Sequence, residues 1–251
     1  MKILVSNDDG IGARGIQELA KALKEIGDVT VVAPLSEQSA VGHAISMKNP
    51  LRVTEHYVNG EFFGYAVSGT PADCVKMGIR NIMEEKPDIV VSGINHGSNV
   101  AVNIIYSGTV SAAREATFMD IPSIAMSITS HNPEHFDPAT QIAKELVEKV
   151  VKNGLTQGTL LNVNVPNVPS EKIQGTKITT QGLSTWDDYY EERIDPYGNK
   201  YYWLKGTLGD GNLGETSDEF AIENNFISVT PIHFDLTDTD MVDNLKNWDL
   251  R

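Results

Sequence analysis

Residues 2–15 read KILVSNDDGIGARG, and this short stretch decides the class of fold. Its first five residues are almost wholly apolar, which is typical of a strand buried on both faces of a parallel sheet. The polar residues Asn7, Asp8 and Asp9 follow at once, and apolar residues then recur at helical spacing as far as Ile26. The stretch therefore predicts a buried strand, a polar turn and an amphipathic helix.

Strands and helices continue to alternate beyond this stretch. Further strands are expected at residues 29–33, 51–58, 61–67, 89–92, 123–127 and 160–165, the second and third as a hairpin around Asn59-Gly60. Helices are expected at residues 70–84, 109–118 and 137–151, the first opened by Thr70 as N-cap and by Pro71. This order predicts the α/β class, with a mostly parallel sheet and right-handed crossovers.

The last third of the chain has a different composition. Residues 186–204 contain two Trp and five Tyr around the turn sequence DPYGN, so we expect a long aromatic hairpin there. A Gly-rich loop at 206–214, a strand at 226–229 ending at Pro231 and a terminal helix at 239–248 are expected to follow. We expect a catalytic domain of residues 1–180 and a smaller appendage of residues 181–251 that makes oligomer contacts.

The aromatic hairpin is the reason to expect a subunit interface. An isolated two-stranded hairpin is marginally stable in water, and its aromatic side chains would leave a large apolar patch that a partner could cover. The alternative is that the hairpin and the terminal helix fold back onto their own domain.

Composition excludes several classes of protein. The 251 residues allow one large domain or one domain with an appendage. A single cysteine excludes an intramolecular disulfide framework and suits a reducing compartment. Because the sequence shows no signal-peptide pattern and no apolar run of about 18 residues, we expect a cytoplasmic protein without a membrane partner. The net charge of −14 also argues against a nucleic acid polymer as partner.

Polar residues follow the strands where a parallel sheet binds its ligands, beyond the carboxyl ends. Asp8 and Asp9 follow the first strand, Ser39 comes after the second, and Asn95 follows the strand at 89–92. Adjacent carboxylates at a buried strand end are unfavourable unless a cation neutralises them, and a hard divalent ion with oxygen ligands would do so. The alternative is that Asp8 caps a helix and Asp9 faces water.

A dinucleotide site is a weaker interpretation of the same turn. Gly10, Gly12 and Gly15 match the pattern G-x-G-x-x-G between a strand and a helix. Two carboxylates directly before the pattern would repel a pyrophosphate. The second strand also ends in Ala33-Pro34, where the pattern requires an acidic residue for the ribose.

A second candidate feature is the segment Tyr106-Ser107-Gly108-Thr109-Val110, which precedes an apolar-faced helix. Backbone N–H groups at such a helix start bind phosphate, so Ser107, Gly108 and Thr109 are candidate phosphate-binding residues together with Asn95. The alternative is that Ser107 or Thr109 is merely an N-cap. His43 and His96 lie on candidate site loops and are possible acid–base groups.

Several motifs taken together resemble the survival protein SurE family over nearly the whole chain. The motifs are SNDDG at 6–10, GTPADCV at 69–75, SGIN at 92–95, YSGTV at 106–110, LNVNVP at 161–166, DPYGN at 195–199 and SVTP at 228–231. The resemblance implies a Rossmann-like domain with helices on both faces of the sheet and a smaller C-terminal part. It also implies homodimers or homotetramers that exchange C-terminal elements. Ala40 and Ala101 depart from the family pattern, which commonly has Gly at both positions.

The activity implied by this resemblance is a metal-dependent phosphatase for nucleoside 5′- and 3′-monophosphates, in some members also for polyphosphate. The family's metal ligands fall on Asp8, Asp9, Ser39 and Asn95. We therefore expect a phosphomonoesterase with one Mg²⁺ or Mn²⁺ per subunit, in which Asp8, Asp9 and Asn95 are catalytic.

Two other mechanisms share the acid-after-strand arrangement. An aspartyl-phosphate phosphatase usually has the sequence Asp-x-Asp, whereas Asp8 and Asp9 are adjacent. A non-enzymatic phospho-receiver module needs an acceptor Asp where this chain has Asn95.

Overall fold

Six parallel strands form the centre of a nine-stranded sheet, in a computed structural model that describes residues 1–209 and 214–249. In sheet order they are β4 (Glu61–Val67), β2 (Asp28–Pro34), β1 (Lys2–Ser6), β5 (Ile89–His96), β6 (Ser123–Ile128) and β7 (Thr159–Val165). At one edge β3 (Val53–Val58) pairs antiparallel with β4. At the other edge β11 (Ile227–His233) pairs antiparallel with β7 and parallel with β8 (Thr176–Ile178).

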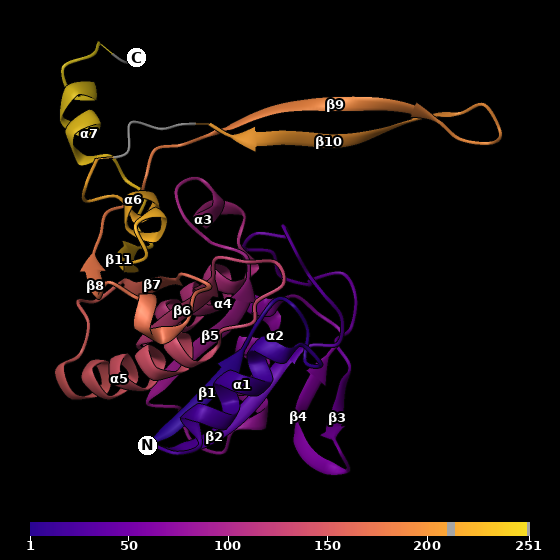
Figure 1. Ribbon diagram of the computed structural model, residues 1–251, viewed down its shortest axis with the longest axis vertical. Coiled ribbons are helices and arrows are strands. Elements are labelled where there is room, and N and C mark those ends of the chain that lie inside the picture. The colour runs from indigo at the N-terminus through magenta and orange to yellow at the C-terminus, as the bar shows by residue number, and fades with distance from the viewer. Residues whose placement is uncertain (210–213, 250–251) are drawn as a thin grey trace.

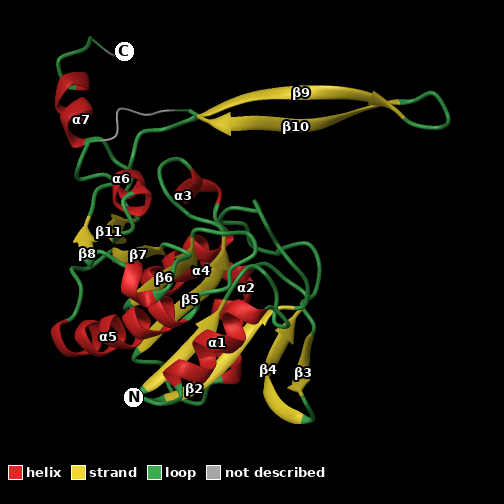
Figure 2. Ribbon diagram, viewed as in Figure 1, coloured by secondary structure: helices red, strands yellow, loops and turns green. Residues whose placement is uncertain are grey.

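Helices cover both faces of this sheet (Figures 1 and 2). One face carries α1 (Arg14–Leu23) and α5 (Asp137–Asn153), and the other carries α2 (Pro71–Met77), the π-helix η1 (Gly78–Ile82) and α4 (Gly108–Phe118). Apolar side chains on both faces of the first strand require this double cover. Ile3 and Val5 pack into the core under α1 and α5, whereas Leu4 packs into the core under α2 and α4. The expected Rossmann-like α/β fold is therefore confirmed.

The remaining elements belong mostly to the C-terminal part. They are α3 (Asn103–Tyr106), the 3-10 helix η2 (Ser170–Lys172), β9 (Trp186–Ile194), β10 (Lys200–Leu208), α6 (Asp218–Glu223) and α7 (Thr239–Leu245). β9 and β10 form a separate antiparallel hairpin that extends away from the main sheet (Figure 1). The division of the chain at residue 180 stays a prediction. In the described part of the chain no helix is both long and apolar enough to cross a membrane.

The strand expected at 89–92 continues to His96 as β5. Four further predicted boundaries are wrong. The hairpin continues to Leu208, so residues 206–208 are strand and not loop, while residues 210–213 of the expected Gly-rich loop lie outside the described part. The helix expected at 70–84 is α-helical only to Met77 and then becomes a π-helix. The terminal helix ends at Leu245, three residues before the expected end.

The fourth boundary concerns the returning strand, which passes through Pro231 instead of ending there. β8 pairs only with Ile227, Ser228 and Val229 of β11. At Pro231 the strand is therefore a sheet edge on that side, where the missing N–H breaks no ladder hydrogen bond.

Two of the three glycines of the G-x-G-x-x-G pattern, Gly10 and Gly15, have structural explanations that need no nucleotide. Gly10 has a φ of +95°, which favours glycine. Gly15 lies at the start of α1 so close to β5 that a Cβ there would stand 1.9 Å from the carbonyl oxygen of Ile94. A Cβ on Gly12 would meet nothing within 4 Å.

We therefore expect Gly15→Ala to separate α1 from β5 and to lower the free energy of unfolding by roughly 2 kcal/mol, the range known for overpacked cores. Gly12→Ala is the matched control and should leave the stability within about 0.5 kcal/mol of the parent. Urea denaturation of the three proteins is the measurement. Equal stability of the two variants would contradict the close packing of α1 on β5.

Candidate active site

A cavity of about 770 Å³ lies at the carboxyl ends of β1, β2 and β5. It is lined by Asp8, Asp9, Ser39 and Asn95, the four residues predicted as metal ligands, and by Ser107. The sheet order β2-β1-β5 explains this convergence, because neighbouring parallel strands end at the same edge. Gly108 and Thr109 do not line this cavity. Both lie against Asp8, which does line it.

Asp8 is the most buried acid of the site, with 5% of its surface exposed. The Thr109 hydroxyl donates a hydrogen bond to its Oδ1. The start of α4 packs directly on the carboxylate, because a Cβ on Gly108 would stand 2.8 Å from Asp8 Oδ2. Burial raises the pKa of Asp8 to about 6, the hydrogen bond from Thr109 opposes this, and the charge of Asp9 adds to it.

Asp9 is less buried and points into the same cavity. Its Oδ2 accepts a hydrogen bond from the backbone N–H of His96 at 3.2 Å. Burial raises its pKa to about 6 as well; the His96 N–H lowers it, Glu37 raises it and His131 lowers it.

These two carboxylates fit a divalent cation. Within residues 1–209 and 214–249, neither forms an ion pair with Lys or Arg, so no lysine or arginine of this part compensates for their burial. The same residues contain no cluster of three His, Cys, Asp or Glu side chains that could hold a metal. A metal bound here would therefore have two carboxylates and neutral oxygens as its donors, a set that suits Mg²⁺ or Mn²⁺ better than zinc.

The neutral oxygens that could complete such a site belong to Ser39 and Asn95, which both line the cavity. Ser39 Oγ lies in the loop after β2 and donates to Glu37 Oε1 at 2.6 Å. Asn95 Nδ2 donates to the carbonyl oxygen of Gly97 at 2.7 Å, so Oδ1 is the atom of this amide that could bind a cation.

The alternative roles can now be compared with the structure. α1 has Ala13 as its N-cap with no side-chain cap, so the interpretation of Asp8 as a helix cap is wrong. Ser107 does cap α4, because its Oγ accepts the N–H of Val110 at 3.1 Å. It also lines the cavity beside Asp8, so capping does not remove it from the site.

The two candidate histidines lie in different places. His96 lines the cavity, and burial, Arg14 and His131 together lower its pKa. His43 is not among the residues that line it. Its Nε2 lies 2.8 Å from Glu115 Oε2, and its ring stacks on Phe118 with centroids 5.2 Å apart.

Further residues of the cavity were not found from the sequence. They are Ala13, Glu37, Ala40, Asn103, His131, Trp186 and Leu208. His131 could have been found, because it follows β6 just as Asn95 belongs to the end of β5. Trp186 and Leu208 come from the base of the hairpin, and no local pattern predicts their return to the sheet edge.

The loop after β5 owes its shape to a buried polar network. The backbone carbonyl of Asn99 accepts hydrogen bonds from Asn162 and Asn164, while the Asn99 side chain donates to Ser127. Two residues later, the N–H of Ala101 donates to Asp218 at 3.1 Å. β7 and the C-terminal part therefore fix the loop that leads from Asn95 to Ser107.

Glu115 fixes the loop on the other side of the cavity. It is 2% exposed and accepts hydrogen bonds from His43, in the loop that carries Ser39, and from Lys76 of α2. Burial alone would raise its pKa, but the hydrogen bonds from His43 and Lys76 and their charges outweigh burial. The pKa of Glu115 therefore lies below its ordinary value of 4.5.

A pKa that is lower in the folded state means that ionised Glu115 stabilises the fold above about pH 4.5 and that this contribution is lost at more acidic pH. We expect Glu115→Gln to lower the free energy of unfolding by about 2 kcal/mol at pH 7 and by clearly less at pH 3.5. Urea denaturation at both values measures this. Glu25→Gln, which removes an exposed partner of Lys144, is the control and should change little. A difference independent of pH would assign Glu115 a packing role alone.

Comparison with known proteins gives a consistent family. A family model described as "Survival protein SurE" matches residues 3–188. A protein of Syntrophobacter fumaroxidans named 5′-nucleotidase SurE is 52% identical over 250 residues, covering 100% of both chains. One of Chlorobium chlorochromatii with the same name is 49% identical, covering 99% of this chain and 92% of its own. The crystal structure of the SurE protein from Aquifex aeolicus is similar with a TM-score of 0.85 and 40% identity, covering 98% of each chain.

Proposed function

The chain belongs to the survival protein SurE family, and from this membership we propose that the cavity around Asp8 and Asp9 is the active site of a metal-dependent nucleotidase. The chain is a 5′-nucleotidase, a hydrolase that releases phosphate from nucleoside 5′-monophosphates. The observation that supports this placement is the pair of desolvated carboxylates, without a Lys or Arg partner among the described residues, on the wall of the cavity that Ser107 also lines.

Asp8 and Asp9 would hold the divalent ion, with oxygens of Ser39 and Asn95 completing the protein ligands. When bound, Mg²⁺ or Mn²⁺ polarises a phosphoryl oxygen and lowers the pKa of a coordinated water. Thr109 orients Asp8 through its hydroxyl hydrogen bond, and the His96 N–H orients Asp9. Both acids are thereby fixed before substrate arrives, so little reorganisation is needed during the reaction.

The phosphate would lie against the start of α4. Ser107 lines the cavity at the N-terminus of this eleven-residue helix, and Asn95 faces the cavity from the end of β5. Asn95 and Ser107 would bind the phosphate oxygens, and the N–H groups of Gly108 and Thr109, which lie behind the cavity wall, would add the positive end of the α4 dipole to this binding. Hydrolysis of 3′-monophosphates and of short polyphosphate, one ion per subunit and a cytoplasmic location complete this proposal.

The metal requirement is tested by chelation. We expect EDTA to abolish phosphate release from AMP, and added Mg²⁺ or Mn²⁺ to restore it. Asp9→Asn should lower kcat/KM at least about 100-fold while the fold survives, because the ion loses a charged ligand. Asp28→Asn, at the opposite end of the sheet where β2 begins, is the matched control and should keep full activity. Full activity of thoroughly chelated enzyme would refute the metal mechanism.

We also propose that the chain forms a homodimer or homotetramer by exchange of C-terminal elements. The hairpin is a two-stranded sheet of its own, with Tyr190 and Tyr197 69% and 91% exposed, and α7 presents Met241 and Val242 to solvent. Such apolar surface is typical of subunit interfaces.

Sedimentation at micromolar concentration tests this assembly. We expect a species larger than the 27.4 kDa chain, and we expect deletion of residues 186–208 to shift it toward the monomer. A fully active species that sediments as a monomer would overturn the proposed assembly.

A further inference from the structure

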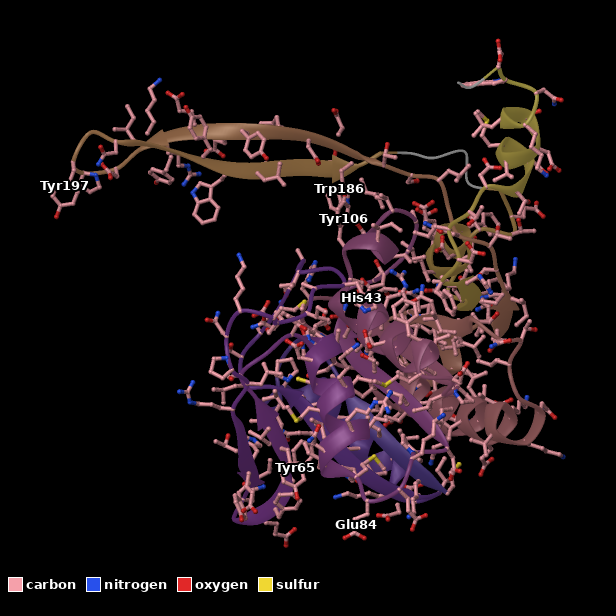
Figure 3. All side chains as sticks on the ribbon, turned by 180° about the vertical axis from the view of Figure 1, so that it is seen from behind. His43, Tyr65, Glu84, Tyr106, Trp186 and Tyr197 are labelled. Atoms are coloured by element: carbon pink, nitrogen blue, oxygen red, sulfur yellow. The ribbon has the colours of Figure 1, made fainter. Side chains whose placement is uncertain are left out.

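The loop between β2 and β3 is held to the rest of the site by its backbone. The N–H of Gln38 donates to the carbonyl oxygen of Asp8 at 2.8 Å. Further along the loop, the N–H of Gly42 donates to the carbonyl oxygen of Tyr106 at 3.1 Å. In Figure 3, His43, the residue after Gly42, lies below Tyr106 in the body of the domain. The backbone of this loop is therefore fixed at two points by hydrogen bonds that involve none of its side chains.

Between these two points, a side-chain hydrogen bond joins two residues of the cavity wall. The Ser39 hydroxyl donates to Oε1 of Glu37 at 2.6 Å, and both residues line the cavity. A hydroxyl has one hydrogen and two lone pairs, so Ser39 Oγ then has only its lone pairs to offer to the cavity. Lone pairs are what a divalent cation requires of a neutral oxygen.

We propose that Glu37 is a positioning residue, which orients the Ser39 hydroxyl so that its oxygen is free to bind the divalent ion. The inference rests on the proposed function and adds to it a residue outside the four proposed ligands. Hydrogen-bond partners of this kind orient metal ligands in many proteins and strengthen metal binding.

The neighbouring carboxylates show why the hydroxyl needs a separate acceptor. Asp8 and Asp9 line the same cavity, and a hydroxyl that donates to either of them occupies an oxygen that the ion requires. The same hydrogen bond would turn the lone pairs of Ser39 Oγ away from the ion. Glu37 prevents both effects, because its carboxylate accepts the hydrogen bond from Ser39 instead.

A purely electrostatic role of Glu37 is the alternative. Within residues 1–209 and 214–249 Glu37 forms no ion pair, so its negative charge could attract a cation without any contact to Ser39. The two roles differ in what glutamine can replace. Glu37→Gln keeps an acceptor oxygen for the hydroxyl and removes the charge, whereas Glu37→Ala removes both.

The test is titration of the metal-free protein with Mn²⁺, with the free ion measured by electron paramagnetic resonance. We expect Glu37→Ala to raise the Kd for Mn²⁺ about tenfold, the lower end of the range known for hydrogen-bond partners of metal ligands. Glu37→Gln should stay within about threefold of the parent, because the acceptor is retained. Glu134→Ala is the matched control: it removes an exposed carboxylate that lines a different cavity, and it should bind Mn²⁺ as the parent does. Glu37 is itself exposed, so we expect its variants to fold.

A double-mutant cycle with Ser39→Ala assigns the effect to the hydroxyl. Because Glu37 acts through Ser39 in this proposal, Glu37→Ala should change the Kd less than about twofold once the hydroxyl is absent. Equal losses with and without the hydroxyl, or equal losses for Glu37→Gln and Glu37→Ala, would overturn the positioning role in favour of a charge effect. Binding by Glu37→Ala that equals binding by the parent would overturn it as well.

Phosphate release from AMP at varied Mn²⁺ concentration separates this inference from the proposed function. We expect Glu37→Ala to need about tenfold more Mn²⁺ for half-maximal activity and to keep kcat within about threefold of the parent at saturating Mn²⁺. A damaged loop would lower kcat at every concentration, so a loss that saturating Mn²⁺ does not restore would overturn the positioning role. Absence of Mn²⁺ binding to the parent would overturn the proposed metal site and this inference with it. Binding of Mn²⁺ with the expected order of variants, but without hydrolysis of AMP, would overturn the proposed function alone.

Discussion

Two adjacent carboxylates at the end of a strand buried on both faces are the constraint on which the rest of the structure depends. Ile3, Leu4 and Val5 commit β1 to the middle of the sheet, so the chain must leave it at the site edge with Asp8 and Asp9 partly removed from water. The described part of the protein supplies hydrogen bonds to them but no lysine or arginine that pairs with them. The polar surroundings of this edge, from Ser39 to Asn95, follow from the need to accommodate that charge.

The sequence predicts the parts of the site that depend on strand ends. Asp8, Asp9, Ser39 and Asn95 meet because β1, β2 and β5 are neighbours, and strand–helix alternation predicts a parallel sheet with such an edge. Trp186 and Asn103 could not be predicted in this way. Their contact joins residues 83 positions apart, and nothing in the local pattern of either segment indicates the other. The extent of the hairpin was missed for a different reason: Gly206 was interpreted as loop, although it pairs with Asp188 inside the ladder.

The C-terminal part also positions the loop after β5. The loop after β5 receives hydrogen bonds from Asp218 and Gln181 at Ala101 and from Trp186 at Asn103. These contacts determine where the loop passes on its way from Asn95 to Ser107. The sheet and the C-terminal part therefore both determine the geometry of the edge where the candidate site lies.

Two residues of the site loops hold a conformation that ordinary side chains avoid. Ala40, directly after Ser39, has a φ of +56°, and the fully buried Ala101 has a φ of +49°. The left-handed region costs a residue with a Cβ about 1 kcal/mol, and glycine adopts it freely. This accounts for the glycine common at both positions in the family. The chain therefore carries local backbone strain beside its candidate site, and these two positions are natural starting points for engineering a more heat-resistant form of the enzyme.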